Sequence, residues 1–361
     1  MTACRGCGDE RLTRVLDLGA APPADHFPPA TGGGDDVTYP LAMEVCDACG
    51  LAQLAEDATV AEEPRGVEPQ ALKDQAAAAV ERVAAAGWLR GRTVREFGSP
   101  HGGSWTGLLA GRGFSVVSDG PADVVLDSFG IMHERDQAAA FRRRAAVTAP
   151  GGVLLLQYHA LETIVTQGQW NALRHGHFAY YSRPALRRLL ASAGMTIETS
   201  WHFELYGGTE LVAAVHATAT PTPVAMGVSD DDTVVDRLKA GALQRAADGH
   251  TSKLAAWLAD RHRDGTSVAA YGAASRAVAL FSLAGVNREL VSAVADASPA
   301  KHGRRMPGTD IPVVSPAELI AMDPDLVLLT LPDLLDEVAT RFPVLAGRFV
   351  DIDRLDARGY G

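Results

Sequence analysis

The sequence is poor in cysteine, in aromatic residues and in positive charge. It has four cysteines in 361 residues, 6% aromatic residues and a formal net charge of −11. Such a chain is a poor ligand for a nucleic-acid backbone, because that binding depends on clustered Lys and Arg. It also lacks a run of 18 apolar residues, so no membrane-spanning helix is predicted. We therefore expect neither nucleic acid nor membrane as a partner.

The rest of the composition is that of a globular protein with a substantial core. Hydrophobic residues make up 47% and charged residues 21% of the chain, which is typical of soluble domains. A length of 361 residues is sufficient for two or three domains. No secretory signal peptide is recognised, so a cytoplasmic location is expected.

The four cysteines form two C-x₂-C pairs, Cys4 with Cys7 and Cys46 with Cys49. Each pair presents two thiolates to one ion, and two pairs complete a tetrahedral S₄ site that suits Zn²⁺. Two disulfides are the alternative, which a reducing compartment disfavours. A closed S₄ site has no open position. The predicted zinc is therefore structural and holds together a loop-rich module over residues 1–62.

Beyond this module, predicted strands and helices alternate in two blocks. Helices over residues 67–86 and 136–147, with strands near 93–97, 114–117, 122–127 and 153–156, predict a doubly wound parallel sheet. Residues 217–233 are rich in Thr, Pro, Ser and Asp and predict a linker. Strands near 267–271, 291–295 and 326–329 then predict a second α/β unit.

A glycine turn follows the first strand of the parallel sheet. It reads Glu96-Phe-Gly98-Ser99-Pro-His-Gly102, and glycines there let the backbone approach a ligand closely. An acidic residue before the first glycine is more typical of S-adenosylmethionine (SAM) sites than of dinucleotide sites. Asp119, just after the second strand, could accept hydrogen bonds from ribose hydroxyls. An ordinary turn and a solvated loop aspartate are the alternatives.

Residues 272–275, Gly-Ala-Ala-Ser, form a similar turn in the last unit, which could bind a phosphate or simply close-pack.

Polar and aromatic residues cluster at two places in the middle of the chain. His175, His177 and Tyr180 lie within six residues, and Tyr206 precedes a Gly-Gly pair. Imidazoles and phenols are candidate general bases and hydrogen-bond donors. A metal site at the two histidines is disfavoured because no carboxylate motif accompanies them.

Four segments together resemble the zinc-containing, SAM-dependent C-methyltransferases that act on nucleotide-linked deoxyketosugars. The segments are the two cysteine pairs, the 96–102 loop (similar to E-I-G-S-N-D-G), residues 175–182 (similar to H-E-H-x-x-Y-F-S), and the tail with 271–275, 301–308 and 311–316. The resemblance implies an α/β fold of three domains. These are a zinc-binding domain (1–62), a shortened Rossmann-like class I methyltransferase core (63–222) and a second Rossmann-like domain (223–361).

The resemblance also implies roles for individual residues. The cofactor loop would comprise Glu96, Gly98, Ser99 and Gly102. Ser128 to His133 would match the N-N-V-x-x-H segment beside the cofactor. The substrate would face His177 and Tyr180, with His133, His175 and Tyr206 as further catalytic candidates. The implied cofactors are SAM, or its product S-adenosylhomocysteine (SAH), and a structural Zn²⁺.

The chain departs from the family pattern near the expected site. The segment before the core has no tyrosine, and only a few residues separate Asp119 from the next strand, where the family has a further helix and strand. The family's H-G-G-S appears as Tyr206-Gly-Gly-Thr209, and Gly176 replaces the middle residue of H-E-H. A phenol, with a reference pKa near 10, is a weaker base than imidazole at about 6.5.

Three functions fit this pattern. The first is C-methylation, in which a base deprotonates a carbon acid such as a nucleotide-linked sugar or another natural-product intermediate. The second is cyclisation of an S-adenosyl-methylene adduct from a radical-SAM partner, with release of SAH. The third is a non-catalytic protein that has lost the cofactor, against which the retained Gly98 and Gly102 argue.

Overall fold

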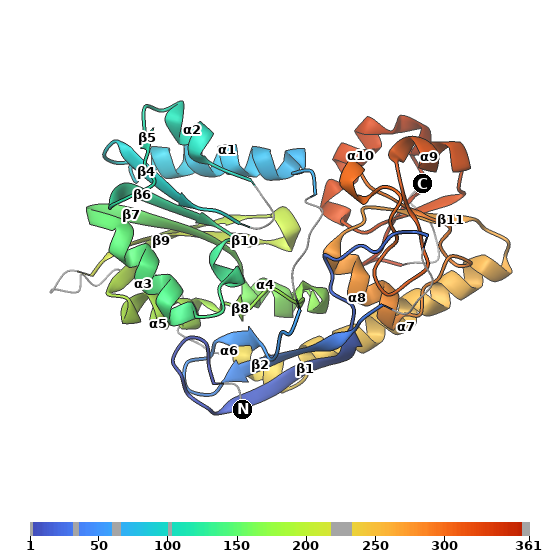
Figure 1. The fold of residues 1–361 in the computed structure, drawn as a ribbon, viewed down its shortest axis with the longest axis horizontal. Coiled ribbons are helices and arrows are strands. Elements are labelled where there is room, and N and C mark those ends of the chain that lie inside the picture. The colour runs from blue at the N-terminus through green and yellow to red at the C-terminus, as the bar shows by residue number, and fades with distance from the viewer. Residues whose placement is uncertain (1–2, 32–35, 60–65, 100–102, 218–232, 356–361) are drawn as a thin grey trace.

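The computed structural model describes residues 3–31, 36–59, 66–99, 103–217 and 233–355 (Figure 1). Its strands form three sheets, of four, six and five strands. Both boundaries predicted between the domains, after residues 62 and 222, lie outside the described residues. No helix in the described ranges is long and apolar enough to cross a membrane.

The first sheet is antiparallel and carries the cysteine pairs. Its strands are β1 (Leu12–Ala21), β2 (Tyr39–Cys46), β3 (Ala52–Leu54) and β8 (Ala179–Tyr180), in that order. β8 comes from a distant part of the sequence, and Tyr180 pairs with Ala52. The N-terminal module is therefore completed by residues from the chain's middle segment.

The second sheet has the strand order β5-β4-β6-β7-β10-β9. The strands are β4 (Thr93–Phe97), β5 (Ser115–Val116), β6 (Ala122–Ser128), β7 (Thr148–His159), β9 (Met195–Phe203) and β10 (Thr209–His216). β5, β4, β6 and β7 are parallel, and β10 is antiparallel to both β7 and β9. Residues 117–121 connect β5 directly to β6. This is the shortened core that the sequence predicts.

Helices cover both faces of this sheet. α1 (Gln70–Ala85) and α2 (Thr106–Ala110) pack on one face, while α3 (Gln137–Val147) and α5 (Arg183–Ser192) pack on the other (Figure 1). The predicted helix over 136–147 is confirmed. Asp136 caps it by accepting a hydrogen bond from the Ala139 N–H at 2.8 Å, which satisfies one of the free donors of a helix start.

The third sheet is parallel, with the order β13-β12-β11-β14-β15. Its strands are β11 (Val268–Tyr271), β12 (Val294–Ala295), β13 (Val313–Val314), β14 (Leu326–Leu329) and β15 (Phe349–Asp351). The accompanying helices are α7 (Ala242–Arg263), α8 (Ser275–Leu283), α9 (Pro316–Met322) and α10 (Leu335–Arg341), and α6 (Thr233–Lys239) precedes them. The predicted second α/β unit is confirmed.

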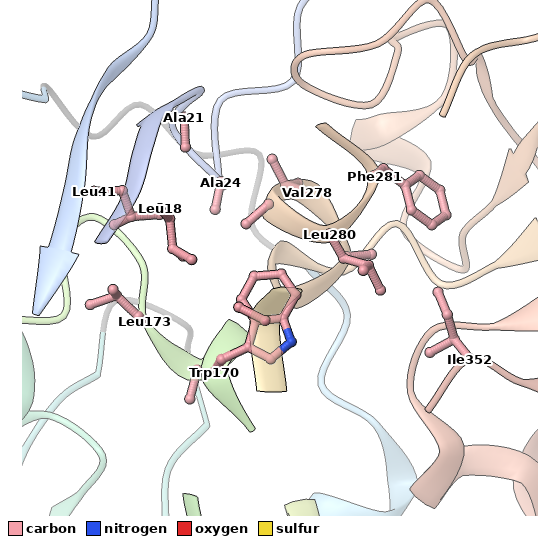
Figure 2. Packing of buried hydrophobic residues seen from close by; sticks show 14 of the residues in the cluster. Leu18, Ala21, Ala24, Leu41, Trp170, Leu173, Val278, Leu280, Phe281 and Ile352 are labelled. Carbon is pink, nitrogen blue, oxygen red and sulfur yellow. The ribbon is translucent and has the colours of Figure 1, made fainter. Parts of the chain in front are cut away.

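One hydrophobic core joins all three parts of the chain. Trp170, in the 3-10 helix Trp170–Ala172 that follows α4 (Leu161–Thr166), is 1% exposed. Figure 2 shows it between Leu18 of the first sheet's hairpin and Leu280 of α8. Because burial of a large aromatic side chain contributes several kcal/mol, this shared core fixes the three parts relative to one another.

Candidate functional site

The four cysteines converge as the sequence predicts. Their sulfur atoms all lie within 4.8 Å of one another, with Sγ–Sγ distances of 3.5 Å for Cys4–Cys49 and 3.6 Å for Cys7–Cys46. A tetrahedral zinc site with Zn–S bonds of about 2.3 Å has S–S edges of about 3.8 Å. A disulfide needs about 2.05 Å. The donor set therefore fits Zn²⁺, and the four thiols do not pair as disulfides.

The two cysteine turns have the same construction. Gly8 and Gly50 follow the pairs with φ of 78° and 73°, and each N–H donates to the carbonyl of the first cysteine of its pair at 2.9 Å. Positive φ costs glycine little, which explains a glycine after both pairs. The Cys49 carbonyl also accepts from Arg188 Nη1 of α5 at 2.8 Å. The metal site thus fastens the N-terminal module to the middle domain and lies apart from the cavity described next.

A cavity of about 270 Å³ lies where the three parts meet. Its wall includes Phe27 of the N-terminal module, Met132 after β6 and Leu331 after β14. Six residues predicted from the sequence also line it: Ser99, Ser128, His133, His177, Tyr180 and Tyr206. The cavity therefore lies at the carboxyl edge of the parallel strands, where ligands bind in open α/β sheets.

The predicted cofactor loop borders this cavity. Glu96 Oε1 accepts from the Trp105 N–H at 2.7 Å, and Oε2 accepts from the Ser104 hydroxyl. Glu96 therefore shapes the far end of the loop. A Cβ built on Gly98 would meet no atom within 4 Å, so the space beside it is open. Gly102 lies outside the described residues.

Ser128 and Asp119 have different surroundings. Ser128 is in the cavity wall, and its hydroxyl donates to Gln157 Oε1 at 2.8 Å. Asp119 is exposed, accepts from the Ser118 hydroxyl at 3.1 Å and is not among the lining residues.

Two residues of the wall have a strained backbone. Phe129 and Tyr206 have φ of 58° and 57°, the left-handed region that costs a non-glycine residue roughly 1–3 kcal/mol. Beside Phe129, a Cβ on Gly130 would lie 2.9 Å from the Gly98 carbonyl oxygen. Strain concentrated at one cavity is typical of functional sites.

A buried ion pair supports the segment that carries Phe129 and His133. Asp127 Oδ1 accepts from the N–H groups of Gly130 and Ile131 at 2.8 and 3.0 Å, and Oδ2 lies 2.7 Å from Arg144 Nη2. Both Asp127 and Arg144 are 1% exposed. Burial raises the pKa of Asp127, and the Arg144 charge opposes that rise.

Replacing Arg144 with methionine is expected to lower the free energy of unfolding by about 3–5 kcal/mol, because it leaves Asp127 buried without its partner. When the pKa of a carboxyl is higher in the folded than in the unfolded state, the group stabilises the fold at pH values below its unfolded pKa. This stabilisation is lost as the pH rises through the folded pKa. The deficit relative to wild type should therefore grow from pH 5 to pH 8. Urea unfolding at both pH values measures it. Arg143→Met, on the same helix with a half-exposed side chain, is the control, and an equal loss there would contradict the prediction.

The histidines of the wall differ in their hydrogen bonds. His133 Nδ1 lies 2.9 Å from the Gly176 carbonyl, and the His133 and His177 ring centres are 4.5 Å apart. A carbonyl only accepts, so Nδ1 of His133 carries the proton and Nε2 keeps the lone pair. His177 Nε2 instead accepts from Arg174 Nε at 2.7 Å.

The tyrosines also differ. The Tyr180 hydroxyl donates to the Ala172 carbonyl at 3.2 Å and accepts from the Arg174 N–H at 3.3 Å. Burial raises its pKa. Tyr206 has its ring 5.4 Å from Arg276 Cζ, and burial raises its pKa as well. Both residues are therefore neutral phenols, and the hydroxyl of Tyr180 is already hydrogen-bonded to backbone groups.

His175 faces away from the cavity. Its Nε2 lies 3.1 Å from the Pro40 carbonyl, and its ring packs edge-on against Tyr39 at 6.1 Å. Gly176, with φ of 81°, turns the chain between His175 and His177. The position of His175 assigns it to packing against the N-terminal module.

Several titratable residues of the wall are absent from the sequence-based candidates, and His159, Arg276 and Lys301 are among them. His159 is the last residue of β7, and the rule that ligands bind at the carboxyl ends of parallel strands could have found it. Arg276 follows the 272–275 turn. In that turn the Asp296 carboxylate accepts a hydrogen bond from the Ala273 N–H at 2.8 Å. A carboxylate of the protein therefore occupies a donor of the turn that the sequence analysis considered for a phosphate.

Comparison with known proteins agrees with these features. A family model described as "C-methyltransferase C-terminal domain" matches residues 213–350, and one described as "Putative zinc binding domain" matches residues 4–62. C-methyltransferase NovU of Streptomyces niveus is 24% identical, over 96% of this chain and 94% of its own length.

Solved structures are similar to part of the chain. Magnesium protoporphyrin IX methyltransferase (ChlM) of Synechocystis PCC 6803 with bound SAH is 14% identical with a TM-score of 0.30, over 42% of this chain and 90% of its own. The PH0226 protein of Pyrococcus horikoshii OT3 is 12% identical with a TM-score of 0.34, over 42% and 94%. These scores are too low to identify a ligand or an activity.

The two family models and the full-length relative name the same kind of protein, and the sulfur cluster fits the zinc-binding domain. The chain therefore combines regions that match a zinc-binding domain and a C-methyltransferase C-terminal domain, and it is similar over most of its length to a C-methyltransferase.

Proposed function

We propose that the protein is a SAM-dependent C-methyltransferase that deprotonates a small carbon acid and directs its methylation within the cavity. The observation that carries this proposal is the position of His133. It lines the same cavity as Ser99 of the glycine loop and Gly103, the first described residue after that loop. A base and a cofactor loop on one cavity are what methylation at carbon requires.

His133 is the base in this proposal. The Gly176 carbonyl fixes its proton on Nδ1, so Nε2 can accept a proton from the acceptor carbon. His177 is less suited, because its Nε2 lone pair is engaged by the Arg174 guanidinium. Protonating His177 would break this bond and place two positive charges side by side.

Removing the proton leaves negative charge on the oxygen next to the acceptor carbon. Tyr206 is the phenolic donor for that oxygen, because burial keeps it protonated. Arg276 adds a positive charge beside its ring. Tyr180 contributes to the wall, while its hydroxyl holds Arg174 and Ala172 in place.

The cofactor loop would hold the methyl donor. SAM supplies an electrophilic methyl group on a sulfonium, so the protein has only to generate and orient the carbon nucleophile. The open space beside Gly98, together with Ser99 and Gly103 in the cavity wall, fits a bound adenosyl group. Gly130 keeps this space open, since any side chain there would meet the Gly98 carbonyl.

The acceptor in this proposal is a small carbon acid bearing a carbonyl group. A nucleotide-linked sugar and another natural-product intermediate are the two candidates. The cyclase and the non-catalytic alternatives gain no support from the matched names, which are those of methyltransferases.

Calorimetric titration of the zinc-loaded protein with SAM and with SAH tests the cofactor site. We expect both to bind with micromolar Kd, equivalent to about −8 kcal/mol. Incubation with methyl-labelled SAM and candidate acceptors, followed by mass spectrometry, then tests the reaction. A methyl group on carbon supports the proposal. A new ring with SAH release and no added methyl, or no binding of SAM and SAH, would refute it.

A further inference from the structure

Glu68 is an acidic residue of the cavity wall that the proposed reaction does not use. It lies in the segment that leads into α1, where the sequence departs from the family pattern because it has no tyrosine. Its side chain is half-buried and lines the cavity together with Pro69 and Leu72. Deprotonation of the acceptor needs a base and hydrogen-bond donors, so a carboxylate at this place calls for another role.

The Glu68 carboxylate lies directly beside the end of the glycine loop. A Cβ built on Gly103 would lie 2.8 Å from Glu68 Oε1 and 3.5 Å from its Cδ. Gly103 has a φ of 81° and lines the cavity together with Ser99. The missing side chain at Gly103 therefore leaves room for the Glu68 carboxylate, at the edge of the space proposed for the adenosyl group.

Glu68 also acts on the side of the cavity proposed for the acceptor. Burial raises the pKa of Tyr206, and the negative charge of Glu68 adds to this rise. An unpaired carboxylate within range of Tyr206 would oppose the negative charge that deprotonation of the acceptor produces, because like charges repel. A cation bound at Glu68 would remove this opposition.

The described part of the chain supplies no such cation. Glu68 has no ion pair there, and the cationic side chains of the wall have other partners. Lys301 Nζ lies 3.3 Å from Asp296 Oδ2, Arg276 Nη2 lies 3.2 Å from His159 Nδ1, and Arg174 Nε donates to His177 Nε2 at 2.7 Å. The positive partner of Glu68 is therefore to be sought in a ligand.

We propose that Glu68 binds the ammonium group on the methionyl part of SAM and of SAH. The inference rests on the proposed function, which places an adenosyl cofactor beside the glycine loop. An ammonium group only donates and a carboxylate only accepts, so their hydrogen bond is charge-assisted and stronger than a neutral one. The sulfonium of SAM has no N–H group and is the poorer match. A bound cofactor then neutralises Glu68 before the acceptor loses its proton.

Calorimetric titration of the zinc-loaded full chain tests this role with four ligands. SAM, SAH and decarboxylated SAH all carry the ammonium group, whereas 5′-deoxy-5′-methylthioadenosine lacks the whole amino-acid part. Glu68→Gln should weaken binding of the first three ligands equally, by about tenfold, the lower end for a hydrogen bond to a charged group because Glu68 is half-buried. Binding of methylthioadenosine should not change, which also shows that the variant keeps its adenosyl site.

Glu81→Gln is the matched control. It removes the same charge from a side chain of α1 that is 71% exposed, and it should leave the affinity for all four ligands unchanged. Unchanged SAH binding in Glu68→Gln, a loss for SAM alone, or an equal loss for methylthioadenosine would each overturn the proposal. A loss for SAM alone would mean that Glu68 acts on the sulfonium.

The same titrations separate this inference from the proposed function. If the wild type binds neither SAM nor SAH, the proposed function falls and the role of Glu68 falls with it. If the wild type binds both and Glu68→Gln binds them equally well, only the role of Glu68 falls.

Discussion

Cys46→Ser is expected to remove most of the bound zinc and to destabilise the whole chain. Cys46 is fully buried, and a structural zinc in a small domain contributes roughly 10 kcal/mol or more to folding. The N-terminal module shares its core with the other two parts through Trp170. Unfolding of this module should therefore destabilise the other two parts as well. If about 5 kcal/mol is lost, Tm should fall by about 10 °C. Zinc analysis by mass spectrometry and thermal unfolding measure both effects.

Ala48→Ser is the matched control for this experiment. It places the same hydroxyl in the same turn, at an exposed position that does not ligate the metal. We expect one zinc per chain and an unchanged Tm. A Cys46→Ser protein that keeps its full zinc content would contradict the S₄ assignment.

His133→Gln is expected to lower kcat by about 10²–10⁴, the usual contribution of a general base. Glutamine keeps a donor for the Gly176 carbonyl but cannot take a proton. SAM affinity should stay within about twofold, since His133 acts on the acceptor. Methyl transfer from labelled SAM to the acceptor found by product analysis gives kcat, and calorimetry gives the SAM affinity.

His175→Gln changes a histidine next to Gly176, the hydrogen-bond partner of His133, without touching the cavity. His175 binds the Pro40 carbonyl, so its loss should cost stability and leave kcat nearly unchanged. Full activity of His133→Gln, or an equal loss in His175→Gln, would remove His133 from the role of base. The comparison also separates two histidines that the sequence offers alike as catalytic candidates.

Local patterns predicted much of the fold. The C-x₂-C pairs predicted the sulfur cluster because two residues between thiolates fix a turn that grips one ion. The helix predicted over 136–147 is found, and the structure shows that the Asp136 carboxylate caps its first turn. The short connection after Asp119 predicted the shortened sheet, since residues 117–121 cannot form another helix and strand.

Side-chain direction at the site could not be predicted in the same way. His175 and His177 are two residues apart, yet the chain turns at Gly176, which has a φ of 81°. His175 therefore packs against the N-terminal module, whereas His177 lines the cavity. The Tyr180 hydroxyl is used by backbone groups of Ala172 and Arg174. Neither fact has a sequence signal, because each depends on groups brought together by folding.

The sequence by itself determined the cysteine cluster, the order of strands and helices along the chain, and the glycine loop that borders the cavity. These follow from spacing and periodicity, which act over a few residues. Only the tertiary structure decided which imidazole can accept a proton and that Arg276 reaches His159 across 117 residues of sequence. A tautomer is set by the partner of one nitrogen atom, and that partner is fixed only when separate domains pack together.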